Sequence, residues 1–317
     1  MAAEDRTRER GIIAPAMPQG DIIGLAPPLR LTCEEVEEVV SVHRQRRQTG
    51  AGTNAPTNPF SDQGYRRMTK KSGHKSAVWL SGPNIAAAEI AASIGYTAVV
   101  LDIEHGSFDL CTLEQFIPVL KGLELEVLAK VLAPERGPIQ QALDFGADAV
   151  VIPHILDAAH AEKTCAFTKF PPHGERSFAG GRTVAYGSPD DQWFVDQDFK
   201  TRCYPMIEHA GALRDIGHIL SLNTVDGVFI GPSDLSLRRG RGSYKRSEAD
   251  FADLKAIAEA AKAAGKHWLL PAWSVSEKKF GLENNAHTLV LTMEHGAISL
   301  GFRDAWNITA QLLSPAH

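Results

Sequence analysis

Two carboxylates, each placed directly after an apolar run, are the residues of this sequence best suited to chemistry. Glu208 follows the run 204–207, and Asp234 follows the run 225–230, which is rich in β-branched and aromatic side chains and ends at a Gly-Pro pair. Two hard oxygen donors with space for water suit Mg²⁺ or Mn²⁺, with Co²⁺ as a further option. The structural alternative is that Asp234 caps the next helix and Glu208 forms a salt bridge.

The elements that must position these acids alternate regularly from residue 77 onward. Strands are expected at 77–81, 98–103, 127–131, 149–153, 202–208, 227–231, 267–271 and 288–292. Helical patterns between them include 85–94, 139–145, 158–168, 251–264 and the run after Gly301. Eight such units in this length predict a (β/α)8 TIM barrel, whose active site lies at the carboxyl ends of the strands. A doubly wound sheet would need a glycine-rich phosphate turn after its first strand, and 81–84 reads Ser-Gly-Pro-Asn.

Three further residues with chemistry of their own lie at or next to the ends of expected strands. His105 could act as a general base, because its unperturbed pKa lies near neutrality. Lys130 interrupts an apolar run, which indicates an anionic neighbour; a Schiff base or a solvent-facing strand end are the alternatives. His154 ends the fourth strand. In the long loop 170–182, Arg176 or Arg182 could bind a substrate carboxylate or pair with a nearby acid.

Composition excludes several classes of protein. The 317 residues are 44% hydrophobic with a formal charge of -5, and no long basic tract indicates nucleic-acid binding. The four cysteines form no CxxC pair, which favours reduced thiols in an intracellular protein over a disulfide framework or a zinc site. No stretch favours a membrane span, a signal peptide or a transit peptide, so the expected location is the cytoplasm.

The first 72 residues differ from the remainder, which is expected to form the barrel at 73–317. Prolines recur there, and one helix is expected from a capping box at Thr32 and Glu35 to about residue 48. We interpret 1–72 as an arm that packs on the barrel or on a neighbouring subunit, with disorder as the alternative.

Four motifs in the barrel region resemble one family. They read VVLDIEH at 99–105, QALDFGA at 141–147, FPPxGxR at 170–176, and IE at 207–208 with DGVFIGPSDLS at 226–236. Together they resemble the HpcH/HpaI aldolases, the metal-dependent class II pyruvate aldolases, over residues 76–313 or so.

The resemblance implies a divalent metal on Glu208 and Asp234, completed by water and a 2-oxo acid. It also implies His105 as catalytic base, Asp144 as the acid that raises its basicity, and a substrate carboxylate held at the backbone around Ser233. A homo-oligomer, a trimer or a hexamer that exchanges its last helix, is implied as well. The expected reaction is retro-aldol cleavage of a 4-hydroxy-2-oxo acid to pyruvate and an aldehyde through a metal-stabilised enolate.

This chain departs from the family pattern at several positions. Lys130 replaces the usual arginine, Met206 a usual glutamine and Ser177 a usual glycine, while His154 matches the macrophomate synthase branch. Lysine cannot reproduce the planar fork of arginine. Oxaloacetate decarboxylation through the same enolate is therefore an alternative, as are a Schiff-base aldolase that uses Lys130 and a barrel that has become a binding protein.

Overall fold

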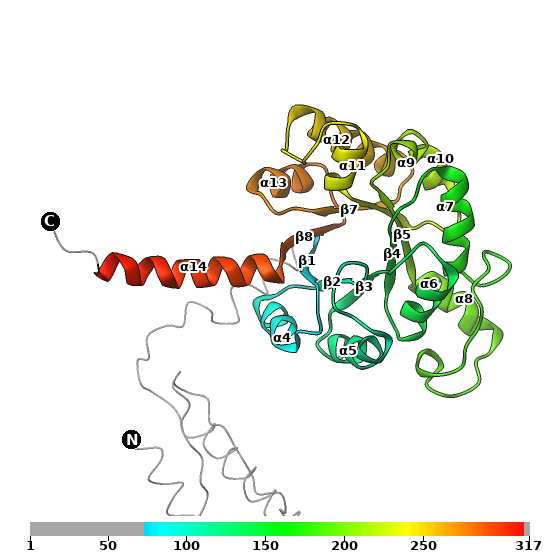
Figure 1. The fold of residues 1–317 in the computed structure, drawn as a ribbon. Helices are drawn as coiled ribbons and strands as arrows, with labels where there is room; N and C mark the ends of the chain where they lie inside the picture. Colours follow the sequence, from blue (N-terminus) through cyan, green and yellow to red (C-terminus); the bar gives the residue numbers. More distant parts are fainter. Residues whose placement is uncertain (1–72, 314–317) are drawn as a thin grey trace, which may run out of the picture. The chain divides into compact units, whose positions relative to one another are not determined.

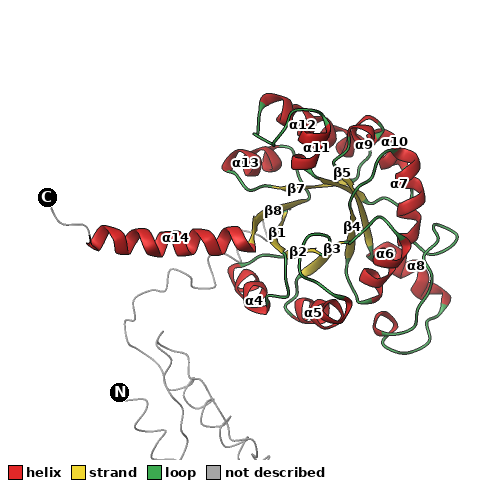
Figure 2. Ribbon diagram, in the orientation of Figure 1, coloured by secondary structure: helices red, strands yellow, loops and turns green. Residues whose placement is uncertain are grey.

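The computed structural model describes residues 73–313, and the helix expected within 1–72 lies outside the described residues. Eight parallel strands close into a barrel in the order β1 to β8, each paired with its sequence neighbour, and β1 pairs with β8. Helices surround the strands in Figure 1 and Figure 2. The (β/α)8 barrel expected from the sequence is confirmed.

The strands and helices alternate along the chain. The strands are β1 Lys75–Leu80, β2 Ala98–Asp102, β3 Glu126–Lys130, β4 Ala149–Ile152, β5 Arg202–Ile207, β6 Gly227–Ile230, β7 His267–Pro271 and β8 Thr288–Met293. The α-helices are α4 Ile85–Ile94, α5 Leu110–Gly122, α6 Arg136–Asp144, α7 Ala158–Cys165, α8 Asp191–Lys200, α9 Ala210–Arg214, α10 Ile216–Ser221, α11 Pro232–Arg238, α12 Glu248–Ala263, α13 Val275–Glu283 and α14 Glu294–Leu313. Two 3₁₀ turns, Ala166–Thr168 and Arg182–Val184, lie between α7 and α8.

Local sequence explains where several helices begin. The side chains of Asn84 and Asp109 accept hydrogen bonds from the first turns of α4 and α5. Ser247 and Ser274 form capping boxes at the starts of α12 and α13. The last helix was expected only after Gly301 but begins at Glu294, because an interior glycine costs a helix only about 1 kcal/mol.

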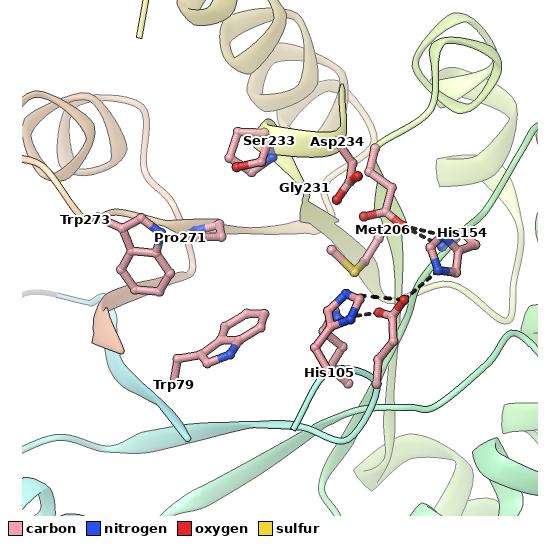
Figure 3. Close-up of a pocket in the computed structure, with 13 residues that line it drawn as sticks. Trp79, His105, His154, Met206, Gly231, Ser233, Asp234, Pro271 and Trp273 are labelled. Atoms are coloured by element: carbon pink, nitrogen blue, oxygen red, sulfur yellow. Dashed lines mark hydrogen bonds and ion pairs between the residues drawn. The ribbon is translucent and has the colours of Figure 1, made fainter. Parts of the chain in front are cut away.

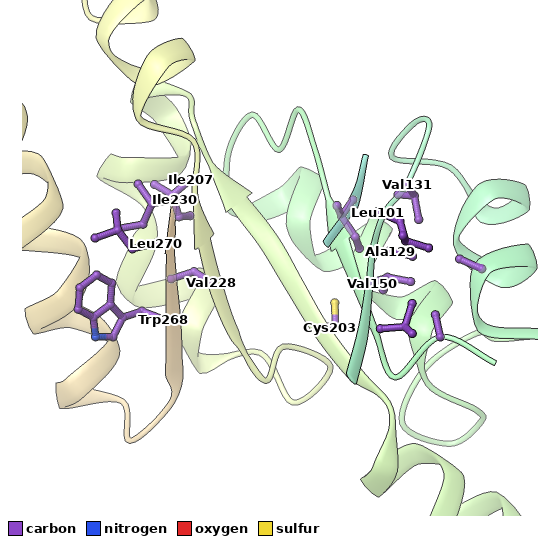
Figure 4. Packing of buried hydrophobic residues seen from close by; sticks show 14 of the residues in the cluster. Leu101, Ala129, Val131, Val150, Cys203, Ile207, Val228, Ile230, Trp268 and Leu270 are labelled. Carbon is purple, nitrogen blue, oxygen red and sulfur yellow. The ribbon is translucent and has the colours of Figure 1, made fainter. Parts of the chain in front are cut away.

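Two apolar layers hold the barrel. Alternate strand residues fill its interior, where Trp79, Met206 and Phe229 lie nearest the site described below. The intervening residues face the helices, and Figure 4 shows such side chains, among them Ile207 and Ile230. Because side chains alternate along each strand, this packing fixes the register, and the register fixes which residues reach the barrel's mouth.

Candidate active site

A cavity of about 160 Å³ opens at the carboxyl ends of the strands. It is lined by residues from β1 to β7 or the segments that follow them: Trp79, Glu104, His105, Lys130, His154, Met206, Glu208, Gly231, Pro232, Ser233, Asp234, Pro271 and Trp273. Figure 3 shows this arrangement. Active sites of this fold lie at this face of the barrel, and six of the eight residues expected at the site line the cavity.

The two candidate metal ligands come from adjacent strands. Glu208 directly follows β5, and Asp234 lies in the first turn of α11, just after β6. Glu208 is 3% exposed, and its Oε1 accepts a hydrogen bond from the backbone N–H of His154 at 2.6 Å. Burial raises the pKa of the Glu208 carboxyl, and the nearby negative charge of Asp234 acts in the same direction.

Gly231 leaves the space that this carboxylate occupies. A Cβ at position 231 would lie 2.6 Å from Glu208 Oε2 and 2.7 Å from Glu208 Cβ, closer than atoms can approach. A side chain there would displace Glu208. The Gly-Pro pair therefore ends β6 and also makes room for the second oxygen of Glu208 beside the cavity.

Glu104 connects the polar side chains of the cavity. Its Oε1 lies 2.5 Å from His154 Nε2 and 3.5 Å from His105 Nε2. Its Oε2 accepts a hydrogen bond from Lys130 Nζ. One carboxylate thus contacts both candidate histidines and the candidate lysine, and dashed lines lead from the labelled His105 and His154 in Figure 3.

Lys130, the last residue of β3, is 4% exposed and lies between two carboxylates. Its Nζ also donates to Asp102 Oδ1 at 3.1 Å. The other oxygen of Asp102 accepts from Trp79 Nε1 at 3.1 Å. A lysine ammonium has three donors, so one remains after these two bonds. The anionic neighbour expected for Lys130 is confirmed, as two acids from the adjacent strand's end.

Asp144 and Arg176 do not line the cavity. They bind each other, with Arg176 Nη2 2.9 Å from Asp144 Oδ1. The guanidinium also lies over the Phe170 ring at 4.7 Å, and its burial lowers its pKa while Asp144 opposes that shift. Within one chain, the carboxylate recorded beside the His105 imidazole is that of Glu104, at 3.5 Å from Nε2.

Sequence reasoning did not single out Glu104, Trp79 or Trp273 as site residues. A signal for Glu104 was present, because a lysine buried in a strand needs a carboxylate and the adjacent strand ends in Asp102 and Glu104. The sequence holds no such signal for the two tryptophans, because Trp79 in β1 and Trp273 after β7 meet only when the barrel closes.

Comparison with known proteins decides the family. The family model described as HpcH/HpaI aldolase/citrate lyase matches residues 75–292. The chain belongs to this family. The resemblance inferred from the four motifs is thus confirmed, and the chain is a lyase of the class II aldolase family.

Its relatives in the HpcH/HpaI family include enzymes with named activities. A hydroxypyruvate/pyruvate aldolase of Rhizorhabdus wittichii is 34% identical over 197 residues, which cover 60% of this chain and 76% of that protein. A 2-keto-3-deoxy-L-rhamnonate aldolase of Escherichia coli O6:K15:H31 is 30% identical over 219 residues, covering 66% and 78%.

Solved structures share the fold. An HpcH/HpaI aldolase from Desulfitobacterium hafniense superposes with a TM-score of 0.70 at 23% identity, covering 80% of this chain and 98% of that one. Macrophomate synthase gives a TM-score of 0.67 at 19% identity, covering 79% and 91%. At these identities the likeness concerns the fold alone.

No helix within residues 73–313 is long and apolar enough to cross a membrane.

Proposed function

We propose that this lyase cleaves a 4-hydroxy-2-oxo acid to pyruvate and an aldehyde and requires a divalent cation. The observation that carries the proposal is a pair of carboxylates, Glu208 and Asp234, at the mouth of an aldolase-family barrel beside His105 and Lys130. The relative named hydroxypyruvate/pyruvate aldolase supports pyruvate as a product.

The residues present suit a divalent cation. Burial disfavours the charged form of Glu208, and a bound cation would offset that cost. The described residues contain no cluster of three or more metal-ligating side chains, so Glu208 and Asp234 would hold the ion with substrate oxygens and water completing the shell. When bound, the ion would supply Lewis-acid stabilisation of negative charge on the substrate's keto oxygen.

The protein's own groups would perform the remaining steps. His105 takes the proton of the 4-hydroxyl, the C3–C4 bond breaks, and its electron pair passes toward C3 and the keto oxygen as the aldehyde forms. The remaining donor of Lys130 would stabilise the developing negative charge. Proton delivery to C3 then completes pyruvate, and the backbone around Ser233 holds the substrate carboxylate.

Two alternatives are weaker in this structure. Lys130 donates to two carboxylates, so its nitrogen is not free to attack a carbonyl as a Schiff-base nucleophile. A barrel that only binds ligands would not need this connected set of acids, histidines and lysine. Decarboxylation of oxaloacetate uses the same groups and is one outcome of the substrate test.

That test measures pyruvate release from a panel of 4-hydroxy-2-oxo acids and from oxaloacetate, with Mg²⁺ or Mn²⁺ and after chelation. We expect release from at least one hydroxy acid, lost on chelation and restored by the metal. Release from oxaloacetate alone would replace the aldolase proposal with a decarboxylase. Release that survives exhaustive chelation would reject both.

His105→Ala is expected to slow aldol cleavage by roughly two to four orders of magnitude, the usual scale for a lost general base. Oxaloacetate decarboxylation removes no hydroxyl proton and should lose much less. The measurement compares kcat/KM for the two reactions, with His173→Ala, an exposed histidine outside the cavity, as the matched control. Equal losses in both reactions would mean that His105 only binds substrate.

Glu104→Gln should lower kcat about 10- to 100-fold with little change in KM, the usual scale for a group that orients a site's functional residues. The amide cannot accept hydrogen bonds from Lys130 and His154 at both of its ends. Steady-state kinetics will separate the two parameters, and Glu104→Asp should recover part of kcat. An unchanged kcat in Glu104→Gln would show that the two histidines and Lys130 are positioned without it.

A second copy of this chain is the partner we propose for α14. This helix exposes Phe302 and Trp306 by 76% and 75%, more than a lone chain's surface favours for such side chains. Burial against another copy would remove this apolar area from water. Light scattering should give a trimer or hexamer, and a monomer at micromolar concentration would contradict this.

A further inference from the structure

The cavity has two chemically different sides. His105, His154 and Asp234 lie on one side in Figure 3, and Glu104 and Glu208 contact the histidines. Lys130 lies between the two sides, with Nζ 5.8 Å from the centroid of the Trp79 ring. In Figure 3, Trp79, Pro271 and Trp273 lie across the cavity from His105, His154 and Asp234. A 2-oxo acid bound by the polar side would therefore extend its remaining substituent toward an apolar wall.

The two tryptophans form that wall as a fixed pair. Their rings meet edge to face, with centroids 6.2 Å apart and an interplanar angle of 84°. Trp79 is locked from behind by its hydrogen bond to Asp102 and by Phe229, 6.0 Å away between centroids. Trp273 lies just after β7 and remains 38% exposed, so a ligand could still cover part of its ring.

The charges of the lining do not favour a second anionic group on the substrate. Among the described residues, the side chains that line the cavity include three carboxylates and one ammonium group, that of Lys130. Lys130 is already paired with Asp102 and Glu104. A divalent cation would balance the remaining negative charge, and the carboxylate of the 2-oxo acid would use that cation. If the substrate carried a carboxylate or phosphate at its far end, no cationic side chain of the cavity would be free to pair with it.

From these observations we infer that the aldehyde portion of the substrate is apolar, an aromatic or aliphatic group that packs against Trp79 and Trp273. This inference rests on the proposed function, because it concerns the acceptor side of the same site. Acceptors carrying a carboxylate or a phosphate are disfavoured. Apolar contacts of this kind discriminate between substrates by roughly 10- to 200-fold.

The test compares kcat/KM for two 4-hydroxy-2-oxo acids that differ only at C4, one bearing a phenyl group and one a carboxylate. We expect the phenyl substrate to be favoured at least about tenfold. Trp273→Ala should reduce that ratio about tenfold, and Trp273→Lys should reduce it further by adding a cation to the wall. Val275→Ala, at an 83% exposed neighbour outside the cavity, should leave the ratio unchanged.

A second measurement separates failure of this inference from failure of the proposed function. Deuterium exchange into the methyl group of pyruvate needs the enolate but no aldehyde. If exchange occurs and the carboxylate substrate is favoured, or if Trp273→Ala leaves the ratio unchanged, the inference is overturned. If exchange is absent in the metal-supplemented enzyme, the proposed function itself fails.

Discussion

Glu208→Ala and Asp234→Ala should each fold normally, fail to bind Mn²⁺ and lose at least about three orders of magnitude in pyruvate release. The loss is large because Lewis-acid stabilisation of the developing charge is worth several kcal/mol. Folding should survive because the site lies at the catalytic face of the barrel, away from the face that governs stability. Burial already penalises the charged form of Glu208, so its removal relieves that cost.

Calorimetric titration with Mn²⁺ and thermal unfolding test this prediction together. Glu208→Gln is the matched control, because it keeps the shape and can still accept the His154 N–H bond while it removes the charge. It should unfold at the wild-type temperature and lack the ion. Wild-type affinity for Mn²⁺ in both alanine variants would show that the ion, if any, binds elsewhere.

Lys130→Ala should reduce both stability and turnover. Without the ammonium, the carboxylates of Asp102 and Glu104 lie buried with no cation between them, and breaking a buried pair costs about 3–5 kcal/mol. Loss of one donor facing the developing charge should cost about 2.7–4 kcal/mol of transition-state stabilisation. The ion should still bind, because Lys130 contacts neither Glu208 nor Asp234 in the structure.

Two variants separate the causes. Lys130→Met preserves length without charge, and adding Glu104→Gln to it should restore part of the stability but little turnover. Lys130→Arg should be neutral or worse, because the pocket formed by Asp102 and Glu104 holds a compact ammonium at 4% exposure. Wild-type stability and turnover in Lys130→Ala would mean that the Asp102–Lys130–Glu104 ion pairs contribute nothing to the site.

The barrel could be predicted from the sequence because strand and helix patterns alternate eight times with helix-ending glycines between them. The position of Glu208 and Asp234 beside the cavity could also be predicted, since a carboxylate after a buried strand of this fold lies at the catalytic face. The start of α14 was misplaced because Gly296 and Gly301 resemble helix ends but lie inside the helix.

Two contacts between residues that are far apart in the chain could not be predicted from the sequence. Asp144 and Arg176 were expected at the site, but Arg176, in the loop after α7, pairs with Asp144 through a partly buried ion pair. His154, which contacts Glu104, has a left-handed backbone conformation with φ of 58°. Such a conformation is uncommon for residues other than glycine, although histidine adopts it more often than most, and the sequence gives no local signal for it.

Deuterium exchange into the methyl group of pyruvate tests the central claim most directly, because it requires the enolate and no particular aldehyde. The account predicts exchange in D₂O with Mn²⁺ or Mg²⁺, its loss on chelation, and its absence in Glu208→Ala and Asp234→Ala. Exchange at the wild-type rate in the chelated enzyme or in these variants would contradict a metal-dependent pyruvate lyase at this site.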